Sequence, residues 1–138
     1  MPFLTPDAPE WDALLEAAWT ARSHAFAPYS GFQVGAALQD LEGKVVGGCN
    51  VENAAYPMAL CAERTAICAA VAAGMRPGGM AALVVVTSAD TLTPPCGACR
   101  QVIAEFAEDL PILLSNGRER QLHRLTDLLP HAFTGRNL

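Results

Sequence analysis

The sequence predicts a mixed β-sheet with helices on both of its faces, in one domain spanning residues 1–138. Two β-like segments, residues 32–38 and 44–50, are joined by a short polar turn and are typical of a hairpin. Helical and strand-like segments then alternate, and residues 82–87 form a continuous apolar run that is typical of a strand buried on both faces. We therefore expect a three-layer α/β/α sandwich around a five-stranded mixed sheet.

The N-terminal half begins with a helix predicted at about residues 10–24. Its apolar residues recur every three or four positions, at Trp11, Leu14, Leu15, Ala18 and Trp19. After the hairpin, an Ala-rich helix is predicted at about residues 58–73, and Gly74 is a typical residue to end it. Gly47 and Gly48, in the second hairpin strand, indicate a bulge or the close approach of another backbone.

In the C-terminal half, Cys96 begins a helix that we expect to end near residue 106. A strand follows at residues 111–115, then a turn at Asn116-Gly117, a possible edge strand at 119–123 and a brief helix at 125–129. Ligands of such sheets bind beyond the strand ends, near helix N-termini. We expect the functional site there.

Composition narrows the class of function. Apolar residues make up 51% of a short chain and charged residues 17%, so we expect apolar surface to be buried between identical subunits. The net charge is −5 and the nine basic residues are scattered, which argues against nucleic-acid binding and favours a small-molecule partner.

Compartment is indicated by three features of the sequence. We see no secretion signal at the N-terminus and no apolar run long enough for a membrane span. Five cysteines, an odd number, favour a metal site or free thiols over disulfides, so we expect a cytoplasmic protein.

The chemistry centres on Cys61-Ala62-Glu63 read together with Cys96 and Cys99. Three thiolates can hold one zinc ion per chain and leave its fourth position open for water, as in catalytic zinc sites. A carboxylate beside one ligand can then move protons to and from that water. Zinc-dependent nucleobase deaminases carry this combination.

Helix geometry locates the metal. Residues two apart on a helix do not share a face, so Cys61 and Glu63 converge only on a point beyond the helix N-terminus. Cys96 and Cys99 start the next helix, so the zinc should lie between two helix N-termini, which favour thiolates. Three thiolates on Zn²⁺ leave a net charge of −1, and Arg64 is the natural cation to donate to the sulfurs; Arg100 is a second candidate.

The other cysteines and the histidines are not assigned to the metal. Cys68 lies seven residues beyond Cys61, about 10 Å along a helix, and we interpret it as a small core residue. Cys49 is interpreted as a packing residue, and the three histidines lack ligand spacing: His24, His123 and His131.

These motifs together resemble a family, the small, homotetrameric, three-cysteine type of cytidine deaminase. The resemblance covers about residues 28–106, plus Phe133 in the tail. It is carried by PYSGFQVGAAL (28–38), NVENAAY (50–56), CAER (61–64) and PCGACRQ (95–101).

The resemblance implies hydrolytic deamination of cytidine, with 2′-deoxycytidine as a further expected substrate, in pyrimidine salvage. Glu63 would carry a proton from the attacking water to N3 of the base and then to the departing amino group. Asn50 and Glu52 would hold the ribose hydroxyls, and a carboxylate there would repel a nucleotide phosphate.

The same resemblance implies that the N–H of Ala62 binds the pyrimidine O2 and that Phe32 packs against the base, although Phe32 as a core residue is the alternative. Phe133 would close the site of a neighbouring subunit, giving shared active sites, or would pack on its own domain. Pro94 departs from the family, which often has a small polar residue there. Proline keeps the carbonyl that binds the amine, but the loop geometry could differ.

Three rival functions remain open. A related deaminase could act on another aminopyrimidine nucleoside such as blasticidin S, against which Asn50 and Glu52 argue. A zinc-stabilised binding module would need a fourth protein ligand that we do not find. A thiol redox protein using Cys96 and Cys99 would leave Glu63 without a role.

Overall fold

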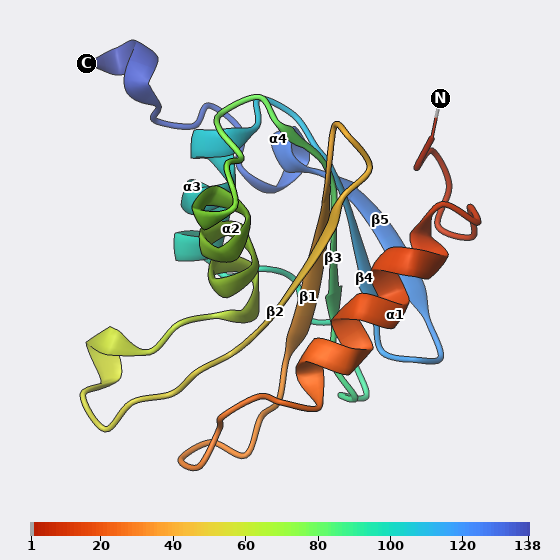
Figure 1. The fold of residues 1–138 in the computed structure, drawn as a ribbon, viewed down its shortest axis with the longest axis vertical. Helices are drawn as coiled ribbons and strands as arrows, with labels where there is room; N and C mark the ends of the chain where they lie inside the picture. Colours follow the sequence, from red (N-terminus) through yellow and green to blue (C-terminus); the bar gives the residue numbers. More distant parts are fainter. Residues whose placement is uncertain (1) are drawn as a thin grey trace.

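The computed structural model describes residues 2–138 and contains one five-stranded sheet (Figure 1). Its elements in chain order are α1 (Trp11–Arg22), β1 (Gly35–Asp40), β2 (Val45–Cys49), the 3₁₀ helix η1 (Tyr56–Met58), α2 (Ala62–Ala72), β3 (Met80–Val86), α3 (Gly97–Phe106), β4 (Pro111–Ser115), β5 (Arg120–Arg124), α4 (Leu125–Leu128) and η2 (Gly135–Asn137).

The strand order is β2-β1-β3-β4-β5, and the sheet is mixed. β1 pairs antiparallel with both β2 and β3, β4 pairs antiparallel with β5, and β3 and β4 are parallel. The parallel pair requires a crossover connection, which α3 supplies. The predicted hairpin and the five-stranded mixed sheet are confirmed.

Helices cover both faces of the sheet, so the predicted three layers are confirmed (Figure 1). On one face α1 buries Trp11 and Leu14 against the sheet. On the other, α2 and α3 bury Ile67 and Ile103. β3 is covered by helices on both faces, and its consecutive apolar side chains point alternately into the two cores. This is why the sequence of residues 82–87 is a continuous apolar run without a polar face.

Gly48 lets α2 approach the sheet edge. A Cβ atom there would lie 2.6 Å from the carbonyl oxygen of Ala62 and 2.6 Å from Oγ1 of Thr65. The predicted close approach of a backbone at this glycine is confirmed. Thr65 also donates to the carbonyl of Cys49 at 2.7 Å, so the first turn of α2 is fixed to the end of β2.

Two predicted boundaries were wrong. The first strand begins at Gly35, not at 32, because the side chain of Asn50 takes the Val34 N–H and the Phe32 carbonyl, which a regular ladder would pair with backbone groups. The second long helix begins at Ala62, not near 58, since Leu60 is held extended by a β-bridge to Val51. Both changes leave the affected residues free to surround the site.

The loops at residues 26–34 and 50–61 project from the same end of the molecule (Figure 1), and a bridge between Phe26 and Val51 joins them. They carry many of the exposed large apolar side chains: Phe26, Tyr29, Phe32, Val51, Tyr56, Met58 and Leu60. No helix within residues 2–138 combines the length and apolar character needed to cross a membrane.

Candidate active site

The three predicted metal ligands meet where α2 and α3 begin. Cys61 and Cys96 are the N-cap residues of these helices, each in an extended backbone conformation, and Cys99 lies in the first turn of α3. Their sulfur atoms all lie within 4.8 Å of one another, and those of Cys61 and Cys96 are 3.9 Å apart. The three thiols therefore meet where the zinc was predicted, between two helix N-termini.

This cluster fits a tetrahedral zinc ion. Thiolates bound to zinc at about 2.3 Å in tetrahedral geometry have sulfurs about 3.8 Å apart, close to the separation of Cys61 and Cys96. The residues that the structure describes supply three such ligands and no fourth. The donor set matches a zinc site with one open coordination position rather than a closed structural site.

Glu63 lies beside the cluster, in the first turn of α2, and is only 4% exposed. Burial, and next the negative charge of Cys61, raise the pKa of its carboxyl group. A carboxyl group with a raised pKa is suited to gaining and losing a proton near neutral pH. Ala62 is the first residue of the same helix, where an N–H has no acceptor within the helix.

Arg64 supplies positive charge to the thiols. Its Nη2 donates to Sγ of Cys61 at 3.4 Å, and its Nε is buried without a partner among the described residues. A hydrogen bond from Cys99, and then the hydrogen bond and charge of Arg64, lower the pKa of the Cys61 thiol to about 5. The contact predicted between Arg64 and a cysteine sulfur is present. With Zn²⁺ bound, three thiolates would leave a net charge of −1, which the guanidinium of Arg64 would balance.

A pocket of about 480 Å³ opens onto the cluster, a volume within the range of small-molecule sites. Cys61, Glu63 and Cys96 form its base. Its walls include Phe32, Val34, Asn50, Glu52, Leu60, Val85, Thr93 and Pro94. Phe32 is 43% exposed, so its alternative interpretation as a core residue was wrong.

Asn50 holds one wall of the pocket. Its Nδ2 donates to the carbonyl of Phe32 at 2.7 Å, and its Oδ1 accepts from the N–H of Val34 at 2.9 Å. A primary amide has two N–H groups and an oxygen with two lone pairs, so one of each remains for a ligand. Asn50 therefore positions the wall and still has capacity to bind a hydroxyl group.

Glu52 is committed to the neighbouring loop. Its Oε1 accepts from the N–H groups of Tyr29 and Ser30 at 3.0 and 3.1 Å, and its Oε2 accepts from the Ser30 hydroxyl. These bonds, led by the Ser30 hydroxyl, lower the pKa of Glu52 and keep it ionised. The motif analysis overlooked Ser30 as the partner of Glu52. Its signal in the sequence was its place in the segment PYSGFQVGAAL (28–38), which carries the family resemblance.

Arg100 and Cys68 lie differently from expectation, whereas Phe133 lies away from the pocket of its own chain. Arg100 donates to the carbonyls of Pro95 and Leu128, both at 2.8 Å, so its guanidinium serves the backbone and not the sulfurs. Cys68 is exposed on α2, and its interpretation as a core residue was wrong, because residue 68 faces away from the sheet. Phe133 is 60% exposed and does not line the pocket of its own chain.

Comparisons with known proteins agree with this geometry. Residues 9–113 match the family model described as the cytidine and deoxycytidylate deaminase zinc-binding region. A cytidine deaminase of Sporosarcina psychrophila is 47% identical over 120 residues, covering 86% of this chain and 87% of the relative. A cytidine deaminase of Mycobacterium tuberculosis is 42% identical over 128 residues, covering 93% and 92%.

Solved structures are also similar. The crystal structure of cytidine deaminase from Burkholderia pseudomallei superposes with a TM-score of 0.84 at 52% identity, covering 88% of this chain and 97% of that one. The crystal structure of cytidine deaminase from Mycobacterium tuberculosis superposes with a TM-score of 0.74 at 42% identity.

Proposed function

The chain belongs to the cytidine deaminase family, and from this premise we propose that it is a zinc-dependent hydrolase that converts cytidine to uridine and ammonia. The observation that carries this is the cluster of Cys61, Cys96 and Cys99 with a buried Glu63 at the base of one pocket. We extend the activity to 2′-deoxycytidine and the biological role to pyrimidine salvage, with residues 1–138 acting as one domain.

One Zn²⁺ per chain is held by Cys61, Cys96 and Cys99. When bound, the ion acts as a Lewis acid that lowers the pKa of a water molecule at its open position. Glu63 would accept one proton of the attacking water and deliver it to N3 of the pyrimidine while the water oxygen bonds to C4. It would then take the second proton from that oxygen and pass it to the amino group, so that the C4–N bond breaks, ammonia leaves and C4 keeps a carbonyl oxygen. The oxygen of water replaces the amine, so the atoms balance as cytidine plus water giving uridine plus ammonia.

Binding of the substrate is proposed to use the pocket walls. The N–H of Ala62, directed from the start of α2, would donate to the pyrimidine O2, and Phe32 would pack against the base. Asn50 and Glu52 would bind the ribose hydroxyls. Because Glu52 accepts bonds from Tyr29 and Ser30, a ribose hydroxyl would share or replace the bond from the Ser30 hydroxyl.

The assembly is proposed to be a homotetramer with shared active sites. Exposed apolar side chains gather on the loops at 26–34 and 50–61, and three of them line the pocket: Phe32, Tyr56 and Leu60. A patch of this kind marks an interaction surface. Phe133 is proposed to enter the site of a neighbouring subunit. We also propose a cytoplasmic location, where the three ligand thiols stay reduced, and no nucleic-acid or membrane partner.

The test is loss of cytidine absorbance on deamination, followed with purified protein as isolated, after chelator treatment, and after zinc is restored. We expect turnover as isolated, loss after stripping and recovery with zinc. Turnover that persists in demonstrably zinc-free protein would contradict the proposal. Comparing turnover of cytidine with turnover of blasticidin S distinguishes a cytidine deaminase from a related deaminase that acts on another aminopyrimidine nucleoside.

A further inference from the structure

The pocket wall that carries Thr93 and Pro94 is formed by residues 88–95, which connect β3 to the metal ligand Cys96. Within the described chain these residues make no backbone–backbone hydrogen bond. Pro94 and Pro95 have no N–H to donate. A loop of this kind keeps its shape only if side chains from outside hold it.

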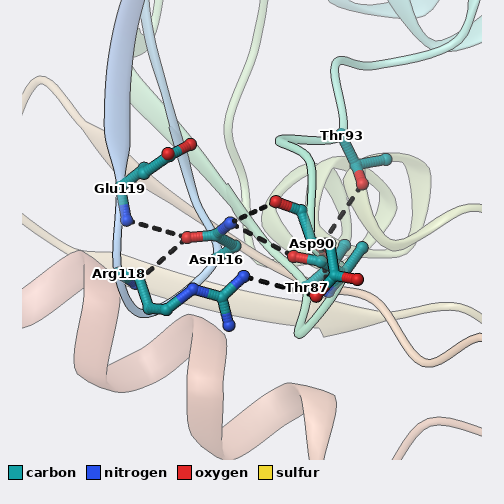
Figure 2. A network of polar contacts seen from close by, with 7 residues as sticks. Thr87, Asp90, Thr93, Asn116, Arg118 and Glu119 are labelled. Carbon is teal, nitrogen blue, oxygen red and sulfur yellow. Dashed lines mark hydrogen bonds and ion pairs between the residues drawn. The ribbon is translucent and has the colours of Figure 1, made fainter.

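Asn116, directly after β4, is one of two buried side chains that reach this loop (Figure 2). It is 4% exposed, and its Nδ2 donates to the carbonyls of Ala89 and Asp90 at 3.1 and 3.3 Å. Its Oδ1 accepts from the N–H groups of Arg118 and Glu119 at 3.0 and 2.8 Å. One amide therefore ties the loop to the β4–β5 turn.

Thr87 holds the same loop from the end of β3 (Figure 2). Its hydroxyl accepts from the N–H of Ala89 at 3.3 Å and lies 3.3 Å from the hydroxyl of Thr93, a residue of the pocket wall. Thr87 is buried, and its N–H donates to the carbonyl of Ser115 at 3.2 Å. The contacts thus run from Asn116 and Thr87 to the surface that a substrate would touch.

We propose that Asn116, acting with Thr87, is a positioning residue that sets the pocket wall at Thr93 and Pro94. This rests on the proposed function and adds a residue that lies outside the pocket. The two donated bonds of Asn116 hold the loop, whereas its two accepted bonds hold only the β4–β5 turn. The two tasks are therefore separable by substitution.

Asn116→Asp makes that separation. A carboxylate still accepts from Arg118 and Glu119 but cannot donate, and it repels the carbonyls of Ala89 and Asp90. We expect KM for cytidine to rise about 10-fold, the low end of effects seen when supporting residues are removed, with a smaller change in kcat. We also expect amide hydrogen exchange in residues 88–93 to become faster.

Arg118→Ala is the matched control. It removes the ion pair with Asp90, which is 3.5 Å long and exposed on both sides, so it touches the same loop without a buried bond. Exposed ion pairs contribute little, and we expect KM and loop exchange to stay within about twofold of the parent.

A purely structural role of Asn116 would lower the amount of folded enzyme, and hence kcat, while KM stays unchanged. That result, or parental loop exchange in folded Asn116→Asp protein, would overturn the proposal. If Asn116→Asp fails to fold, Thr87→Val tests the proposal instead, because valine keeps the shape of threonine without the hydroxyl. An unchanged KM for cytidine in Thr87→Val would then refute the positioning of the pocket wall. Should the parent protein leave cytidine intact, the proposed function fails, while the exchange measurement still decides whether Asn116 holds the loop.

Discussion

The base and the rim of the pocket are built in opposite ways. At the base, Cys61 and Cys96 occupy the N-cap positions of two helices, and Glu63 is buried in the first turn of α2. At the rim, Phe32 and the neighbouring loops are exposed, and Glu52 is held by the loop backbone at Tyr29 and Ser30. The base is fixed by regular structure, whereas the rim is held by side-chain hydrogen bonds.

This difference indicates how the work of the enzyme is divided. The base contains the metal ligands and the proton carrier within one chain, so the chemistry does not require a second subunit. The rim leaves large apolar side chains exposed, which is why we propose that a second subunit helps to enclose the substrate. Substitutions at the base should therefore lower kcat, and substitutions at the rim should raise KM and depend on assembly.

Removal of a base ligand should have the largest effect. We expect Cys61→Ala to lose both zinc and activity, because two remaining thiolates do not complete a catalytic zinc site. Metal analysis and cytidine turnover measure this. Cys68→Ala is the control, since that thiol is exposed on the same helix and lies outside the cluster; a Cys61→Ala protein that keeps full zinc content would contradict the ligand assignment.

Glu63→Gln should be nearly as severe while leaving the metal in place. The amide is similar in shape but cannot carry a proton, and loss of general acid–base catalysis costs about 10²- to 10⁴-fold. Since one residue serves several transfers, we expect a loss near the upper end in kcat, with zinc retained. A loss below about tenfold would show that another group moves the proton.

The base was predictable from sequence because its geometry follows from helix periodicity. Cys61 and Glu63 are two residues apart, and Cys96 and Cys99 three apart, so only a point beyond both helix N-termini satisfies all four. The sheet was predictable for a similar reason, since the hairpin and the apolar strand at residues 82–87 have distinct local patterns.

The rim was not predictable in this way. The side chain of Asn50 replaces ladder bonds at Phe32 and Val34, a long-range contact that local strand propensity does not contain. Asn116 appeared only as part of a turn signal, although its amide reaches a loop 26 residues earlier. Cys68 and Arg100 show the same limit, because the direction of a helical side chain depends on where the helix packs.

Substitutions of Arg64 test whether a cation next to the base of the pocket supports the metal site. Arg64→Ala removes the donor to Cys61 and leaves the thiolate cluster uncompensated, which should reduce zinc affinity or kcat by about 10- to 100-fold. Arg64→Gln retains a hydrogen-bond donor without the charge and should do less harm. Parental kinetics and zinc content in Arg64→Ala would show that the contact has no catalytic role.

Phe133 tests the rim, where we expect the smallest of these effects. It is largely exposed in a single chain, and burial of a phenylalanine side chain contributes about 1.5–3 kcal/mol. If Phe133 closes a neighbour's site, Phe133→Ala should raise KM for cytidine about tenfold, the low end of that range, since each 1.4 kcal/mol is a factor of about ten. Leu138→Ala, another exposed tail residue, is the control.

A mixing experiment then distinguishes a shared site from a site completed within one chain. Subunits carrying Glu63→Gln are exchanged with subunits carrying Phe133→Ala, and exchange is verified by mass. If Phe133 acts on a neighbour, some sites in mixed assemblies combine an intact Glu63 with an intact Phe133 from the adjacent chain. Activity at low cytidine concentration should then exceed the average of the two parents. If Phe133 acts only within its own chain, no site regains both residues, and strict averaging after verified exchange would exclude the shared site.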